Sequence, residues 1–272
     1  MEITPTIFAV IAIIALICEY MDASIGMGYG TALSPILIMM GFLPLQVVPA
    51  VLLGQLVGGL AGGFFHHRLG NINLDFRRDE AIKKRLRGLG YMPRSLDSKV
   101  IFILAVCGFM GALAAVFFAI NIPTLALKIY IGVMVLAIGI VILVRRNRES
   151  NFSWKGLVGI GLLSAFNKGA SGGGYGPLVT GGQIISGREA KSSIGSTTLA
   201  EALVCIVAFV GYVVLKGDIY WTLAAATSIG SIVAAPLAAL TVKRVNTGKL
   251  KFVIGIATSL LGIFTIVRIF IS

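Results

Sequence analysis

Four ionisable side chains lie inside or at the edge of long apolar stretches of this sequence: Glu19, Asp22, Lys168 and Glu201. A charge within hydrocarbon is costly, so ionisable residues in such stretches default to a functional role. Lys168 offers positive charge to an anion, and burial raises the affinity of a carboxyl for a proton. The candidates for ion coupling are therefore Glu19, Asp22 and Glu201, together with Gln55, which lies at a comparable depth.

Two glycine-rich interruptions accompany these charges. Residues 22–35 read DASIGMGYGTALSP and residues 167–180 read NKGASGGGYGPLVT, each with a Gly-Tyr-Gly motif. A broken helix at membrane depth is tolerated only where it is buried in protein or lines a wet cavity. A helix that begins after the break directs free N–H groups and its positive dipole end into that cavity, which suits an anion. The candidate substrate-binding residues near the breaks are Gly28, Tyr29, Gly30, Asn167, Lys168, Ser171, Gly174, Tyr175 and Gly176.

Composition places these residues in a membrane protein. The chain is 57% hydrophobic and 12% charged, with a mean hydropathy of +0.96, whereas soluble domains carry about 25% charged residues. We therefore predict an all-α polytopic membrane protein. The ten apolar segments are 5–21, 29–41, 46–66, 99–120, 125–144, 152–166, 174–186, 192–215, 219–241 and 250–271. The second and seventh are short, and each covers only about 20 Å of a hydrocarbon core of roughly 30 Å.

The two Gly-Tyr-Gly motifs indicate an internal repeat. Superposing them places Gln55 on Glu201 and Asp22 on Lys168. The halves are then residues 1–148 and 149–272, with five segments each. An odd number of crossings inverts the second half, which is the plan of many secondary transporters. We predict that segments 2 and 7 meet as short broken helices near the bilayer midplane.

The net charge of +12 is concentrated between segments, in 67–99, 145–155, 187–191 and 243–251. If all ten segments cross, these basic stretches share one side, which the positive-inside rule makes cytoplasmic. Both termini are then outside, and the basic arm 67–99 is cytoplasmic, where it either contacts anionic lipids or only sets topology. If segments 2 and 7 are re-entrant instead, the termini become cytoplasmic. This charge distribution does not indicate nucleic acid binding.

Each candidate also has a structural interpretation. Asp22 and Lys168 could form an ion pair that only stabilises the fold, with Glu201 bonded to nearby hydroxyls. Ser196 and Thr197 are predicted to line the pore, although small polar residues also occur where transmembrane helices pack closely. No catalytic motif is present, and His66 and His67 lack a second ligand pair, so we expect no enzyme activity, no metal site and no cofactor.

Together these motifs resemble the sulfite exporter TauE/SafE family, also called toluene sulfonate uptake permeases. The resemblance rests on SIGMGYG and SGGGYGP, on Ser193, Ser196, Thr197 and Thr198 opening a segment, and on the Gly-Asn-Ile and Gly-Asp-Ile turns. It covers nearly the whole chain, although Met27 and Tyr29 interrupt glycines that are often consecutive in the family. The resemblance implies a cell-membrane transporter of small sulfur-containing anions (sulfite, organosulfonates, sulfoacetate-like compounds) or carboxylates, driven by a proton or cation gradient. A passive anion channel is the alternative.

Overall fold

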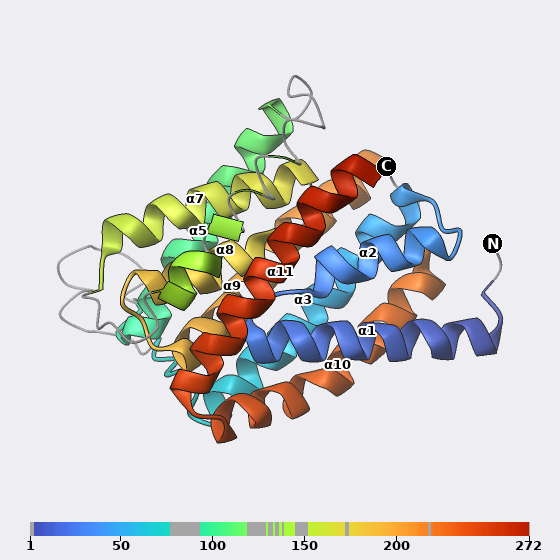
Figure 1. The fold of residues 1–272 in the computed structure, drawn as a ribbon. Helices are drawn as coiled ribbons and strands as arrows, with labels where there is room; N and C mark the ends of the chain where they lie inside the picture. The colour runs from blue at the N-terminus through green and yellow to red at the C-terminus, as the bar shows by residue number, and fades with distance from the viewer. Residues whose placement is uncertain are drawn as a thin grey trace, which may run out of the picture.

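The computed structural model describes residues 3–76, 93–118, 152–171, 174–216 and 219–271, with scattered positions between 129 and 144. These residues form helices and no strand (Figure 1). The helices are α1 (Pro5–Ile25), α2 (Tyr29–Met39), α3 (Pro44–Arg68), α5 (Leu96–Phe118), α7 (Trp154–Ser171), α8 (Tyr175–Ile185), α9 (Ala190–Lys216), α10 (Trp221–Arg244) and α11 (Thr247–Ile271). Residues 77–92 of the basic arm and half of segment 125–144 lie outside the described residues.

Five of the described helices are long and apolar enough to cross a membrane. They are α1, most of α3, most of α9, α10 and the first part of α11. Many of their large apolar side chains are exposed, among them Ile13, Phe64, Val214 and Leu260. Such surfaces suit contact with lipid tails, so the predicted all-α polytopic membrane class is confirmed.

Small residues bring the helices into close contact. A Cβ atom built on Gly230 of α10 would lie 2.8 Å from the backbone nitrogen of Leu16 in α1. A Cβ atom on Gly59 of α3 would lie 2.9 Å from the carbonyl oxygen of Thr198 in α9. Small residues at helix interfaces are typical of membrane proteins because they let backbones approach. In this way α1, α3 and α10 pack together, and α3 joins them to α9.

Both predicted helix interruptions are present. Helix α1 ends at Ile25 and α2 begins at Tyr29, while α7 ends at Ser171 and α8 begins at Tyr175. Gly26 and Gly174 adopt left-handed φ angles of 82° and 77°, which glycine tolerates without strain. Each of the helices that follow, α2 and α8, has 11 residues, or about 16 Å at the usual rise.

The two interruptions contact each other. The Thr180 hydroxyl of α8 donates a 2.9 Å hydrogen bond to the carbonyl oxygen of Gly26. Helices α1 and α7, which precede the two interruptions, run in opposite directions (Figure 1). The inverted relation between residues 1–148 and 149–272 remains a prediction.

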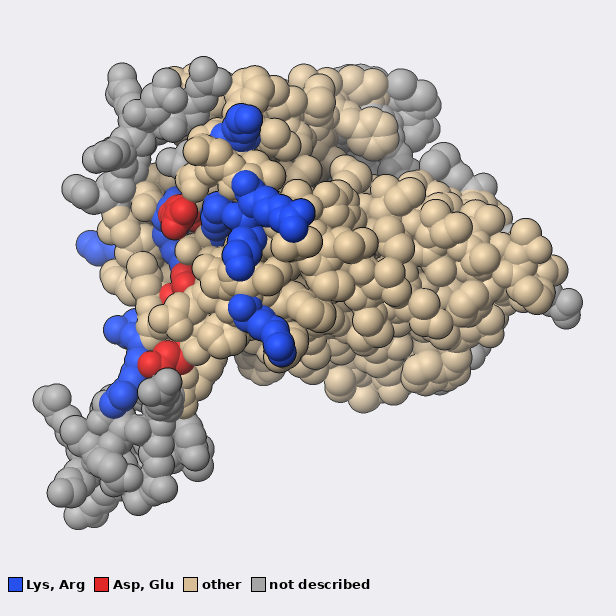
Figure 2. All heavy atoms as spheres, turned by 90° about the horizontal axis from the view of Figure 1, so that it is seen from below, with Lys and Arg blue, Asp and Glu red and all other residues tan. Residues whose placement is uncertain are grey.

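The charged side chains gather at one end of the molecule. Figure 2 shows Lys and Arg at the end opposite the two termini of Figure 1, beside a broad surface without charge. We call this the basic end; the exposed cations described there are Arg68, Arg94, Lys99, Lys155, Lys243, Arg244 and Lys249. The described parts of the four basic stretches therefore share one end.

Candidate functional site

A buried ion pair lies between α7 and α9. The Lys168 Nζ atom is 2.7 Å from Glu201 Oε1, and it also donates a hydrogen bond of 2.7 Å to Gln55 Oε1 of α3. The side chains of Lys168 and Glu201 are only 3% and 4% exposed. Two residues that superpose in the sequence repeat, Gln55 and Glu201, thus bind the same ammonium group. The lysine pairs with Glu201 rather than with Asp22, the partner that the sequence suggested.

Asp22 of α1 instead forms a hydrogen bond across the first interruption to the start of α2. Its Oδ1 atom accepts the backbone N–H of Tyr29, the first residue of α2, at 3.1 Å. A carboxylate at this position satisfies an N–H group that has no partner within the helix, and it interacts favourably with the helix dipole. The amino end of α2 is therefore capped by a side chain.

Helix α8 begins differently. Gly174 precedes it in a left-handed conformation, and no described side chain caps its first turn. The first N–H groups of a helix have no intrahelical partner. Two broken helices thus approach the same place, one with an acidic cap and one without a side-chain cap.

A small central cavity lies where the interruptions meet. Its lining combines three ionisable side chains, those of Asp22, Lys168 and Glu201, with residues from the amino ends of both broken helices. The lining residues are Asp22, Gly28, Gly30, Thr31, Lys168, Gly174, Tyr175, Gly176, Pro177 and Glu201. The structure therefore brings together, around one cavity, most of the residues that the sequence nominated for binding and coupling.

The two repeat tyrosines take different positions relative to the cavity, although both are fully buried. The Tyr29 hydroxyl accepts a 2.9 Å hydrogen bond from the Ser231 hydroxyl of α10, so it lies among helices rather than in the cavity lining. Tyr175 lines the cavity, and its hydroxyl has no hydrogen-bond partner among the described residues.

Glu19 lies one turn before Asp22 and is fully buried. Neither of its carboxyl oxygens has a hydrogen-bond partner within the described part of the chain. A Cβ atom on Gly58 of α3 would lie 2.9 Å from the Glu19 carboxyl carbon, so the glycine makes room for this group. An ionised carboxylate without donors in such a place would be very costly.

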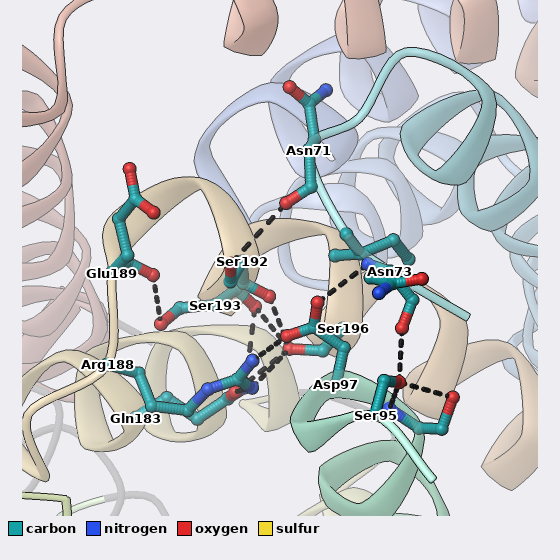
Figure 3. A network of polar contacts seen from close by, with 12 residues as sticks. Asn71, Asn73, Ser95, Asp97, Gln183, Arg188, Glu189, Ser192, Ser193 and Ser196 are labelled. Carbon is teal, nitrogen blue, oxygen red and sulfur yellow. Dashed lines mark hydrogen bonds and ion pairs between the residues drawn. The ribbon is translucent and has the colours of Figure 1, made fainter. Parts of the chain in front are cut away.

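Ser196 belongs to a second polar network (Figure 3), which Thr197 joins through Gln183. Gln183 of α8 donates to the Thr197 hydroxyl at 2.8 Å and accepts from the Ser196 hydroxyl at 2.9 Å. Arg188 donates to Ser196 at 3.0 Å and forms an ion pair with Asp97 in the first turn of α5. The two predicted pore residues thus lie away from the lining of the central cavity.

Sequence analysis missed Gln183, Arg188 and Asp97 as members of a network. Arg188 looked like an ordinary loop charge in a basic stretch, yet its side chain is only 2% exposed. Burial lowers the pKa of its guanidinium, and the ion pair with Asp97 opposes that shift. Two other nominated residues, Asn167 and Ser171, belong to α7, but their side chains lie outside the described residues.

Comparison with known proteins identifies the chain. Residues 86–265 match the sulfite exporter TauE/SafE family. The chain belongs to this family. A similar protein of Bacillus subtilis (strain 168), described as "Probable membrane transporter protein YtnM", is 24% identical over 260 residues, which cover 90% of this chain and 78% of the relative. The resemblance inferred from the glycine motifs is thereby confirmed, and this TauE/SafE protein is a membrane transporter.

The second polar network of this TauE/SafE protein yields a stability prediction. Asp97→Ala leaves the Arg188 guanidinium buried without its counter-ion, and we expect the free energy of unfolding to fall by about 3–5 kcal/mol. Denaturation in detergent micelles measures this loss. Glu189→Ala is the control, because its carboxylate is exposed and bonds only the Thr247 hydroxyl among described partners, so at most about 1 kcal/mol is expected. Equal losses in both variants would contradict the assignment.

Proposed function

We propose that this protein is a secondary transporter of small anions, either sulfur-containing (sulfite, organosulfonate or sulfoacetate-like) or carboxylated, coupled to a proton or cation gradient. One observation carries the proposal. A buried lysine and the amino ends of two broken helices border the same small cavity. Lysine ammonium groups and helix amino ends both favour anions, and discontinuous helices are where many transporters bind substrate.

The anion binds closer to α8 than to α2. The first N–H group of α2, that of Tyr29, already donates a hydrogen bond to Asp22. No side chain in the described part of the chain caps the first turn of α8, which leaves its N–H groups open to an oxyanion. Lys168 donates one hydrogen bond to Gln55 and one to Glu201, and a protonated lysine has three N–H donors. Its third N–H supplies the remaining contact to the anion.

Transport follows from the placement of the cavity between two oppositely directed half-structures. With residues 1–148 and 149–272 as inverted repeats, the cavity lies near the midplane and opens alternately to each side. We place the basic end in the cytoplasm by the positive-inside rule, and both termini outside. Glu19, Asp22, Gln55 and Glu201 are the groups through which a gradient is coupled to the anion.

Flux into proteoliposomes tests this function. The panel contains sulfite, thiosulfate, an organosulfonate and carboxylates, each measured with imposed proton or sodium gradients. We expect at least one sulfur oxyanion or carboxylate to accumulate against its own gradient. Lys155→Ala serves as a control for non-specific charge effects, because Lys155 is exposed at the basic end. Movement of anions only down their gradients would favour a channel, and no movement of any panel member would refute the proposal.

A further inference from the structure

The buried charges around the central cavity do not balance. Three carboxyl side chains, Glu19, Asp22 and Glu201, are 0%, 4% and 3% exposed, and Lys168, at 4%, is the cation that the described residues place beside them. If all four groups were ionised, this buried cluster would carry two excess negative charges. An anionic substrate would add at least one more. Such an accumulation of like charge away from water is strongly unfavourable.

The partners of each carboxyl show which groups are uncompensated. Glu201 lies 2.7 Å from the Lys168 ammonium, so it is held ionised. Asp22 accepts one backbone N–H group, and Glu19 has no hydrogen-bond partner among the described residues. Neither of these two carboxyls forms an ion pair within the described chain. The two excess charges therefore belong to Glu19 and Asp22.

Among the described residues, no other side chain around the cluster supplies the missing positive charge. The histidine His66 of α3 contacts α1 next to Asp22, because its Nε2 atom is 2.9 Å from the carbonyl oxygen of Ala23. Its Nδ1 atom accepts from the Asn71 amide at 3.0 Å, which fixes the neutral tautomer with the proton on Nε2. The remaining titratable groups described near the cluster are Cys18 of α1, Tyr29 of α2, Tyr175 of α8 and Cys205 of α9. The described cations of α10, Lys243 and Arg244, are exposed at the basic end.

We propose that Glu19 and Asp22 each hold one proton while the anion is bound, so that the protein is a symporter moving two protons with each anion. This inference rests on the proposed anion site beside Lys168. With both carboxyls protonated, the cluster is neutral and the anion joins only the Lys168–Glu201 pair. Loss of the two protons restores the repulsion and expels the anion on the side where the protons leave.

A proton fits these two groups better than a metal cation does. Metal cations of the hard type require several oxygen ligands around one point, whereas the Glu19 carboxyl has no polar partner in the described structure. The His, Cys, Asp and Glu residues of the described chain also form no group of three that could hold a metal ion. A proton needs only the carboxyl itself.

The number of protons moved with each anion is measured in proteoliposomes at zero membrane potential. A pH gradient is imposed, and the anion gradient at which net anion flux stops is determined. Two coupled protons should sustain an anion gradient of about 100-fold per pH unit, and one proton only about 10-fold. Glu19→Gln and Asp22→Asn each mimic a permanently protonated carboxyl and should each lower the value to about 10-fold per pH unit. Glu189→Gln makes the same chemical change at an exposed site and should keep the wild-type ratio.

A wild-type ratio of about 10-fold, or one that follows sodium instead of pH, would overturn the two-proton inference. Wild-type ratios in both Glu19→Gln and Asp22→Asn would overturn the assignment to these residues. Exchange of labelled against unlabelled anion is measured in parallel and reports binding and folding of each variant without net proton movement. Exchange without pH coupling would leave the anion transporter standing and remove only the symport; no exchange or flux of any panel anion would remove both.

Discussion

Lys168→Met alone should lower the free energy of unfolding by about 3–5 kcal/mol, and the double variant Lys168→Met, Glu201→Met should recover most of that loss. Removing the lysine leaves the Glu201 carboxylate buried without its counter-ion. Removing both charges replaces a buried ion pair by apolar side chains of similar size, which is often close to neutral. Recovery is incomplete because Gln55 Oε1 also loses the donor that lies 2.7 Å away.

The two variants should nevertheless be equally inactive in anion transport. Both lack the ammonium group that we place against the anion, and the double variant is stable enough to exclude unfolding as the cause. Denaturation in detergent micelles gives the stabilities, and proteoliposome flux gives the activities. Lys155→Met is the matched control, because it removes an exposed lysine of α7 and should change stability by less than about 0.5 kcal/mol.

Two outcomes would contradict this account of Lys168. A double variant that transports at the wild-type rate would show that the lysine only balances Glu201. A single variant as stable as the wild type would show that the two side chains do not depend on each other as the 2.7 Å contact requires.

The features of the site that depend on local sequence were predictable. Gly-Tyr-Gly preceded by an apolar run predicted where α1 and α7 end, because glycine tolerates the left-handed conformations found at Gly26 and Gly174. The repeat also placed Gln55 and Glu201 at equivalent positions, and both contact Lys168. Superposing the two repeats identifies residues at the same depth in their helices, and such residues can contact a common partner.

The partners within the site were not predictable, because they depend on how separate helices approach. Asp22 and Lys168 also superpose in the repeat, yet Asp22 bonds Tyr29 while Lys168 is reached by α3 and α9. Thr197 precedes Glu201 by one helical turn on α9, or about 6 Å along the axis. That displacement is enough to move it from the central cavity to the network of Gln183 and Arg188.

Arg188 illustrates the same limit for charges. In the sequence it belongs to a short basic stretch between two apolar segments, where cations usually contact water or headgroups. In the structure α8 ends beside the start of α7, since the Ser153 N–H group donates to the Ser186 carbonyl oxygen at 3.1 Å. The loop thereby turns Arg188 inward toward Asp97, which no pattern within the loop indicates.

Gly176→Ala should reduce anion transport by roughly 100-fold, because it separates the two interruptions that form the central cavity. A Cβ atom at this position would lie 2.6 Å from the Gly26 carbonyl oxygen and 2.9 Å from Met27 Cα. Both neighbours are backbone atoms, so no side chain can rotate away and α8 must move relative to α1 and α2. A displacement of about 1 Å at a site that orients reacting groups costs about 100-fold in enzymes, and we expect a similar loss for an oriented anion.

The control for this prediction is Gly211→Ala on α9, where a Cβ atom would meet nothing within 4 Å. Alanine favours a helix over glycine by about 1 kcal/mol, so both variants gain helix propensity and only Gly176→Ala adds a backbone clash. Melting in detergent and proteoliposome flux are measured for both, and a folded Gly176→Ala protein is required before its flux is interpreted. If that protein transports at the rate of Gly211→Ala, the close approach of the two interruptions is not what shapes the anion site. If it folds but has lost transport, the backbone contact between Gly26 and α8 is the element that holds the amino end of α8 against Lys168 and the anion.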